Sequence, residues 1–196
     1  FVPNGGRVYY TDRSQPPVLS EMVKLIVKED GNESSLARRA FPLLEHEYEF
    51  WMSSKHAVQL EVNGTAYVAN RYHSGAYSPR PESYREDEDL LRASALEERK
   101  VKGGEGNKLF NNIRSGAESG WDFTSRFIFG SDRKDESPPL PRATADNYRV
   151  LETQGKKQFP LTSEQTAEVL PICLNSFMMR FERNMATLCS TYFSSE

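Results

Sequence analysis

Residues 14–30, SQPPVLSEMVKLIVKED, give the clearest indication of the fold class. The serine that opens this segment can cap a helix, and the two prolines behind it fit a first helical turn, because that turn leaves its N–H groups unbonded. Val18, Met22, Leu25 and Ile26 then recur at spacings of three and four residues and share one apolar face. The segment therefore predicts an amphipathic helix.

A second helix is expected after the segment GNESS, which can end the first helix and cap the next. Pro42 lies inside this second pattern and predicts either a kink or a later helix start. The apolar positions that define the pattern are Leu36, Phe41, Leu44, Tyr48 and Trp51.

Residues 57–69 change period and predict a β-hairpin inserted among helices. Val58, Leu60 and Val62 alternate with polar residues, as they do in a half-buried strand. The dipeptide Asn63-Gly64 favours a tight primed turn, which returns the chain along a second strand.

The remaining segments favour helices separated by loops. An acidic helix is expected from residue 81 to about residue 100, and a shorter helix at residues 107–115. Residues from about 131 to 160 contain prolines and many charges without a clear period, so they predict a long surface loop. A last helix is expected to begin at Thr162 or Ser163, to break at Pro171 and to resume through Phe177, Phe181, Leu188 and Cys189. The fold class is therefore all-α with one small hairpin.

Composition and charge do not indicate a nucleic-acid, membrane or metal partner. The 196 residues suffice for one domain with a core, and their net charge of −3 gives no reason to expect nucleic acid as a partner. No apolar run approaches the roughly 20 residues of a membrane span, so no strong membrane contact is expected from this segment. The two cysteines lie in no metal-ligand cluster, so no metal is expected. Because the sequence begins at Phe1, we expect a processed product or part of a longer protein.

Three motifs combine polar side chains with residues that restrict the backbone: PNGGRVYYTDRSQPP at 3–17, PRPESY at 79–84 and AESGWDF at 117–123. Planar Arg, Asn, Gln and carboxylate groups can engage neighbouring sugar hydroxyls with paired hydrogen bonds, and an aromatic ring suits the C–H face of a sugar. Each motif also has a simpler interpretation. The first is an ordinary turn, the second starts the acidic helix, and the third holds a core tryptophan beside a capping aspartate.

These blocks resemble the trehalase family of glycoside hydrolases, particularly the animal enzymes. The resemblance rests on FVPNGGRVYY, RSQPP, PRPESY, GAESGWDFTSRF and, less closely, VLPICLNSF. It implies an all-α fold, a partial (α/α)6 toroid with a small inserted hairpin, in which residues 1–196 form a central and incomplete part of the catalytic domain. It also implies trehalose as the small-molecule partner and no cofactor.

The resemblance implies an inverting mechanism in which Asp122 is the general acid and a second carboxylate activates water. The acid role requires Asp122 to remain protonated near the working pH, which burial or a nearby carboxylate such as Glu118 or Glu82 would favour. Trp121 is expected to support the acid by packing. The positions that match substrate contacts in the family are Asn4, Arg13, Ser14, Gln15, Arg80, Pro81, Glu82 and Gly120.

The chain also departs from the family pattern. The family's opening signature and the block with the general base are absent, so residues 1–196 alone are expected to be inactive. Cys173 stands where the family usually has an aspartate. These departures leave two alternatives open: a catalytically inactive, truncated trehalase-like sugar-binding protein, or a helical interaction module. The resemblance and the glycosylation sequons at Asn32 and Asn63 predict an extracellular or cell-surface location.

Overall fold

The structure is a computed structural model that describes residues 1–29, 33–93, 105–127 and 164–193. The described elements are mostly helices, with one two-stranded antiparallel sheet, so the predicted mainly helical fold class is confirmed. They form two compact units, residues 1–71 with 170–196 and residues 72–169. The loop predicted at about 131–160 lies outside the described residues.

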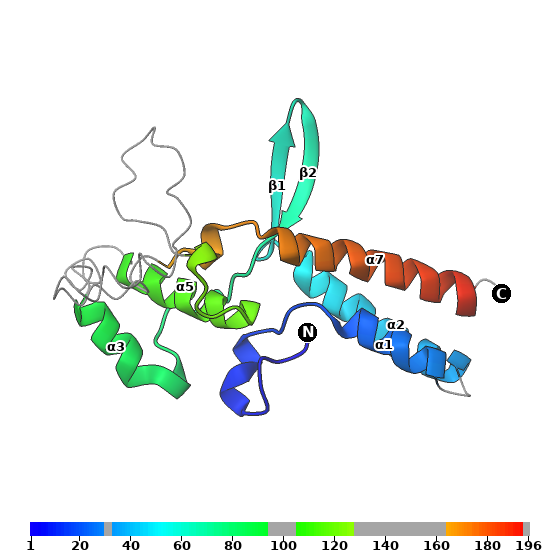
Figure 1. Cartoon of the computed structure of the whole chain (residues 1–196), viewed down its shortest axis with the longest axis horizontal. Helices are drawn as coiled ribbons and strands as arrows, with labels where there is room; N and C mark the ends of the chain where they lie inside the picture. The colour runs from blue at the N-terminus through cyan, green and yellow to red at the C-terminus, as the bar shows by residue number, and fades with distance from the viewer. Residues whose placement is uncertain (30–32, 94–104, 128–163, 194–196) are drawn as a thin grey trace. The chain divides into compact units, whose positions relative to one another are not determined.

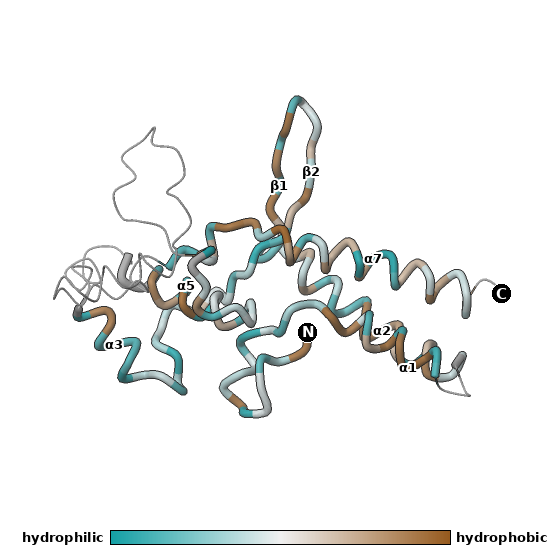
Figure 2. The backbone as a smooth tube through the Cα atoms, viewed as in Figure 1, coloured by the Kyte–Doolittle hydropathy of each residue, from teal (hydrophilic) through white to brown (hydrophobic). Residues whose placement is uncertain are grey.

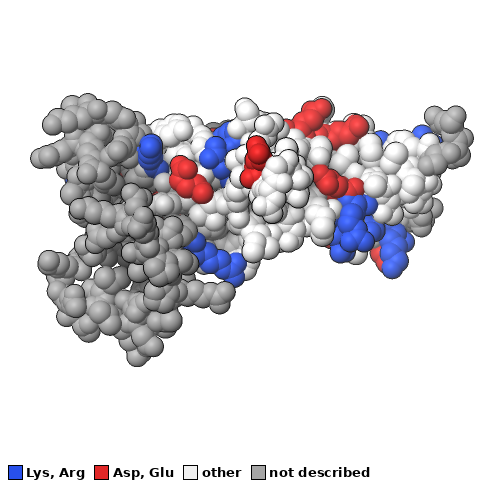
Figure 3. Space-filling view, turned by 90° about the horizontal axis from the view of Figure 1, so that it is seen from above, with Lys and Arg blue, Asp and Glu red and all other residues white. Residues whose placement is uncertain are grey.

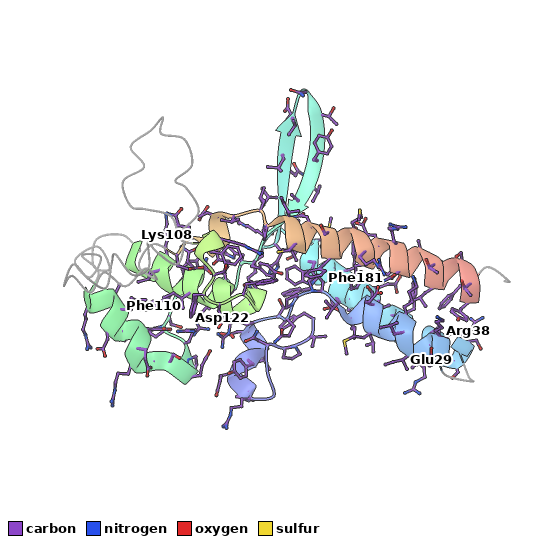
Figure 4. All side chains as sticks on the ribbon, viewed as in Figure 1. Glu29, Arg38, Lys108, Phe110, Asp122 and Phe181 are labelled. Atoms are coloured by element: carbon purple, nitrogen blue, oxygen red, sulfur yellow. The ribbon has the colours of Figure 1, made fainter. Side chains whose placement is uncertain are left out.

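The first unit is built on three helices, α1 (Leu19–Glu29), α2 (Glu33–Trp51) and α7 (Ile172–Tyr192), which pack side by side (Figure 1). Phe181 of α7 is fully buried between them (Figure 4). Burying such apolar side chains is the main contribution to the stability of the unit. The buried core residues are Val27, Ala37, Leu44, Phe181 and Leu188.

Helix α1 confirms the predicted helix but buries a different face from the predicted one. The core lies against Leu19, Val23 and Val27, whereas Val18, Met22, Leu25 and Ile26 are 40–58% exposed. The apolar residues of α1 form a broad face, which Figure 2 shows as brown stretches between teal ones, so periodicity alone did not determine which part of that face is buried.

The predicted helix cap at Ser14 is wrong, because α1 begins at Leu19. The backbone N–H groups of Glu21 and Met22 both donate to the carbonyl of Val18, 3.1 Å away in each case, so the first helical turn starts there. Ser14 instead pairs with Pro3 in an antiparallel bridge.

Helix α2 runs without a break through Pro42, so the predicted later start is wrong. Proline has no N–H group, so Pro42 cannot donate to the carbonyl of Arg38, four residues earlier in the helix. Both residues are exposed. Water can satisfy a carbonyl at such a position, which lets the helix tolerate the proline.

The predicted hairpin is confirmed. Strands β1 (Ala57–Val62) and β2 (Thr65–Asn70) pair from Ala57 opposite Asn70 to Val62 opposite Thr65. The turn residues Asn63 and Gly64 have φ of 52° and 75°, the positive values that a primed turn requires. The hairpin extends away from the three helices of its unit (Figure 1).

An asparagine side chain fixes the base of the hairpin to α7. The Asn70 N–H donates to Asn175 Oδ1 at 2.8 Å, and Asn175 Nδ2 donates back to the Asn70 carbonyl at 3.0 Å. The side chain of Asn175 thereby satisfies both backbone groups of the last strand residue.

The second unit contains α3 (Tyr84–Ala93), α5 (Glu105–Ser119) and the short 3-10 turns η2 (Pro81–Ser83), η3 (Ser125–Phe127) and η5 (Thr166–Glu168). Its core is made by Leu90, Leu91, Leu109, Phe110 and Ile113.

The end of α5 and the start of α7 can be compared with their predicted positions. Helix α5 continues four residues beyond the predicted end at Ser115, because Ser115 and Ser119 are buried and their hydroxyls donate to carbonyls of the preceding turn. Helix α7 begins directly after Pro171, as predicted, but the helix predicted before Pro171 is wrong for the described residues, because residues 164–171 contain only the short turn η5. Within the described ranges, no helix has the length and apolar character needed to cross a bilayer.

Candidate functional site

One group of predicted site residues lies in the first unit, in a loop that closes residues 1–15 on themselves. The Asn4 N–H donates to the Arg13 carbonyl at 2.8 Å, and Asn4 Nδ2 donates to the Ser14 carbonyl at 3.4 Å. Gln15 Nε2 donates to the Asn4 carbonyl at 2.6 Å. The structure therefore brings together all four sequence-predicted residues of this unit, from the two ends of the loop.

Arg13 is fully buried in this loop. Its guanidinium carbon lies 5.1 Å from the centre of the Tyr10 ring, and its Nε lies 3.6 Å from a carboxylate oxygen of Asp12. Gly5 makes room for the ring, because a Cβ at that position would lie 2.6 Å from Tyr10 Cδ2. The glycine in the motif thus serves close packing under Arg13, which an ordinary turn does not require.

A separate group of predicted site residues lies in the second unit, around Arg80. Arg80 Nη2 donates to Asp87 Oδ1 at 2.6 Å, while Arg80 Nε and the Arg80 backbone N–H donate to Oδ2 at 3.0 Å and 2.8 Å. Both side chains are buried, so this two-pronged pair has a fixed geometry. The Arg80 guanidinium carbon also lies 5.0 Å from the centre of the Phe123 ring. The motif at 79–84 therefore contacts the residue that follows Asp122.

Helix α5 holds the segment before Arg80 through a second buried arginine. Arg114 Nε donates to the Ser78 carbonyl at 2.7 Å, and Arg114 Nη2 donates to the Pro79 carbonyl at 2.7 Å. Neither Arg114 nor Asp87 was predicted from the sequence. The signal for Arg114 was its position in the middle of a segment otherwise rich in apolar and small residues.

Asp122 lies on an exposed turn directly after α5 (Figure 4). Gly120 adopts φ of 69° and ends the helix, since its N–H donates to the Ala117 carbonyl at 3.2 Å. The Trp121 N–H donates to Ser119 Oγ at 3.0 Å, and the Thr124 N–H donates to the Trp121 carbonyl at 2.6 Å. The turn thereby exposes Asp122 to solvent, where a ligand can reach its carboxyl.

Trp121 is 45% exposed, so its interpretation as a core anchor is wrong. The guanidinium carbon of Arg126 lies 4.7 Å from the centre of the tryptophan ring. This cation–π contact holds the ring on the surface of the turn beside Asp122.

The sequence suggested Glu118 and Glu82 as carboxyls near Asp122, but the pKa that the charge of Asp122 raises is that of Glu164. Glu118 is fully buried and its Oε2 accepts the His73 N–H at 2.9 Å, and Glu82 is exposed in η2 next to Pro81. The pKa of Glu164 is raised to about 7, chiefly by burial and further by the charge of Asp122, although a hydrogen bond from Thr166 opposes the rise. The segment around Glu164 has no period or motif that could have identified it.

The surface charge contains no concentrated basic region on the face drawn in Figure 3, where Lys and Arg side chains alternate with Asp and Glu. Among the residues that the structure describes, no group of three His, Cys, Asp or Glu side chains is placed to hold a metal ion.

Comparison with known proteins identifies relatives along nearly the whole chain. A family model described as Trehalase matches residues 1–147. Trehalase of Apis mellifera is 35% identical over 180 residues, which is 92% of this chain and 24% of the relative. Trehalase of Homo sapiens is 33% identical over 189 residues, 96% of this chain and 27% of the relative, and that of Dictyostelium discoideum is 33% identical over 194 residues, 97% and 27%. The chain spans about a quarter of the length of these relatives.

Proposed function

Because the chain belongs to the trehalase family, we propose that the whole protein hydrolyses α,α-trehalose to two glucose molecules, with residues 1–196 supplying the acid half of the site. The observation that carries the proposal is the placement of Asp122. Its carboxyl is exposed on a turn whose neighbour, Phe123, packs against the buried Arg80. The exposed carboxyl of Asp122 and the fixed hydrogen-bond donor Arg80 therefore lie in one unit, which supports the proposal.

In the proposed reaction, Asp122 donates its proton to the oxygen that bridges the two glucose rings. The bond from that oxygen to the anomeric carbon breaks as an oxocarbenium-like transition state forms, and a second carboxylate activates water on the opposite face. In an inverting site, the two carboxyl groups stand roughly 6.5–9.5 Å apart to leave room for the water.

The other side chains of the site are proposed to bind and orient the sugar. Asp87 occupies Nε and Nη2 of Arg80, so we assign Nη1 to a substrate hydroxyl. Asn4, Arg13, Ser14 and Gln15 are proposed to form the sugar contacts of the first unit, and Pro81, Glu82 and Gly120 those of the second. The mainly helical fold supports, as part of the same proposal, a partial (α/α)6 toroid with the hairpin as an insertion.

The stereochemistry of the products tests the proposed mechanism in the full-length enzyme. Single displacement inverts the attacked centre, so the first turnovers should release one α-glucose and one β-glucose from each trehalose. Rapid NMR of the anomeric protons, before mutarotation, measures this ratio. Release of α-glucose alone would indicate retention and contradict the proposal.

A catalytically inactive, trehalose-binding protein is the second candidate, because Cys173 replaces a carboxylate that the family pattern contains. Calorimetric titration of residues 1–196 with trehalose separates the candidates. We expect weak or no binding, since this span corresponds to about a quarter of the relatives and the sugar pocket would be only partly built. Tight binding without hydrolysis would favour the second candidate.

We also propose an extracellular or cell-surface location, and the hairpin provides its test. Asn63 is exposed in the turn between β1 and β2, whereas Asn32 lies outside the described residues. After expression through a secretory pathway, a glycosidase that removes N-linked glycans should lower the mass of the wild-type protein. In Asn63→Gln this loss of mass should be smaller by the mass of one glycan. Thr65→Ala should have the same effect, because it destroys the sequon at Asn63. An unchanged shift in both variants would show that Asn63 is unmodified.

A further inference from the structure

We propose that Asn111 of α5 is a positioning residue, which holds the backbone of residues 73–76 against the helix and thereby fixes the place of Arg80 relative to Asp122. The inference rests on the proposed roles of Arg80 and Asp122 in trehalose hydrolysis. Asn111 acts on the reaction through the segment that leads to Arg80.

Helix α5 supplies acceptors for three consecutive backbone N–H groups of a segment, residues 71–77, that forms no helix or strand. The acceptors are side chains spaced by four and three residues, so they lie on one face of α5. The pairs are the His73 N–H with Glu118 Oε2 at 2.9 Å, the Ser74 N–H with Ser115 Oγ at 3.0 Å and the Gly75 N–H with Asn111 Oδ1 at 2.8 Å.

Asn111 makes further contacts with the same segment. Its Oδ1 also accepts the Ser74 hydroxyl at 3.3 Å, and its Nδ2 lies 3.3 Å from His73 Nε2. The Ser74 hydroxyl oxygen in turn accepts the Ala76 N–H at 3.2 Å. Both Asn111 and Ser74 are buried, so water is not at hand to replace these partners. Asn111 therefore stabilises the segment through its amide oxygen and its amide nitrogen together.

The segment held by Asn111 leads directly to Arg80. Three residues further along α5, Arg114 binds the carbonyls of Ser78 and Pro79. The chain before Arg80 is thus bound to α5 at both of its ends. The pair with Asp87 fixes the orientation of the Arg80 side chain, whereas α5 fixes the position of the backbone that carries it.

The same helix carries the turn with the candidate acid. Helix α5 ends at Ser119, and Asp122 lies three residues later in the turn, followed by Phe123, whose ring centre lies 5.0 Å from the Arg80 guanidinium carbon. Because one helix positions both this turn and the segment before Arg80, it sets the separation between the proton donor and the guanidinium assigned to a sugar hydroxyl. A misplacement of about 1 Å between such groups can cost on the order of 10²-fold in rate.

The first test is trehalose hydrolysis by the full-length enzyme with Asn111→Leu. Leucine has a similar size but no acceptor, so the Gly75 N–H and the Ser74 hydroxyl lose their partner. We expect kcat/KM to fall by roughly 10- to 100-fold. An unchanged kcat/KM in folded Asn111→Leu would overturn the inference. If this variant does not fold, Ser115→Ala carries the test, because it removes a neighbouring acceptor without adding bulk, and wild-type kcat/KM in it would have the same meaning.

Asn112→Leu is the matched control. Asn112 is the next residue of α5 and is also buried, and its Oδ1 also accepts a backbone N–H, that of Ala167 in η5 at 3.0 Å. Both variants should lower the urea midpoint by similar amounts, since each leaves a buried N–H without its acceptor. Only Asn111→Leu should lower kcat/KM. An equal fall in both variants would show that lost stability explains the effect, and would overturn the positioning role.

A double-mutant cycle with Arg80→Lys tests whether Asn111 acts through Arg80. Lysine keeps the positive charge but lacks the planar fork that Asp87 holds, so less orientation remains to be lost. Asn111→Leu should therefore lower kcat/KM by a smaller factor in the Arg80→Lys background than in the wild-type background. Equal factors in the two backgrounds would contradict action through Arg80.

Amide hydrogen exchange of the full-length protein provides a measurement that needs no turnover. The Gly75 amide should exchange at least about tenfold faster in Asn111→Leu, and the Ala167 amide should do so in Asn112→Leu. Unchanged exchange at Gly75 would overturn the inference even in an active enzyme. Wild-type protein that releases no glucose from trehalose, while Gly75 responds as expected, would instead overturn the proposed function.

Discussion

Asp122→Asn in the full-length enzyme is expected to abolish measurable turnover of trehalose while trehalose binding survives. The amide has nearly the shape of the carboxyl, so contacts to the sugar persist, but it has no acidic proton to give to the leaving oxygen. Loss of general-acid assistance costs on the order of 10²–10⁴-fold in rate. Glucose release measures turnover, and calorimetric titration measures binding.

The matched control for this variant is Asp89→Asn, which makes the same chemical change on the surface of α3, where Asp89 is 61% exposed and pairs with Arg92. It should retain wild-type turnover. A substrate with a leaving group that needs no proton, such as glucosyl fluoride, should lose far less rate in Asp122→Asn than trehalose does. Full trehalase activity in Asp122→Asn would remove the acid assignment.

The second large effect is expected at the buried pair of Arg80 and Asp87. Asp87→Ala leaves the Arg80 guanidinium buried without its two-pronged acceptor, and removal of one partner from such a pair costs about 3–5 kcal/mol of unfolding free energy. Because Arg80 then loses its fixed orientation, kcat/KM should fall together with stability. Urea unfolding of the full-length protein measures the first effect and trehalose kinetics the second.

Asp89→Ala provides the comparison on the same helix. Its pair with Arg92 has an N–O distance of 3.2 Å, but both side chains are 61% exposed, so its loss should cost about 0–1 kcal/mol. Equal destabilisation by Asp87→Ala and Asp89→Ala would contradict the structural importance assigned to the buried pair.

Several features of the fold and site were predictable because they depend on neighbours in the chain. The hairpin followed from alternation and from Asn63-Gly64, whose positive φ values a primed turn requires. The start of α7 directly after Pro171 followed from the restricted backbone of proline. The motif residues of the first unit were also brought together as a group, since the loop of residues 1–15 closes over a short separation.

Other features were not predictable, because they depend on which elements pack together. The apolar face of helix α1 is broad, and only the positions of α2 and α7 decided that Val23 and Val27, rather than Leu25 and Ile26, are buried. Pro42 was tolerated within α2 because of its exposure, which the local pattern does not reveal.

The same distinction separates the recognised and the missed residues of the site. Local chemistry in the chain determined the helices, the hairpin turn and the polar motifs that include Arg80 and Asp122. Tertiary packing alone decided that Arg114 holds the backbone before Arg80, and that Glu164 is buried where the charge of Asp122 acts on it. The physical reason is that burial and charge coupling act through space between residues far apart in sequence, whereas helix periodicity and turn conformation act between residues a few positions apart.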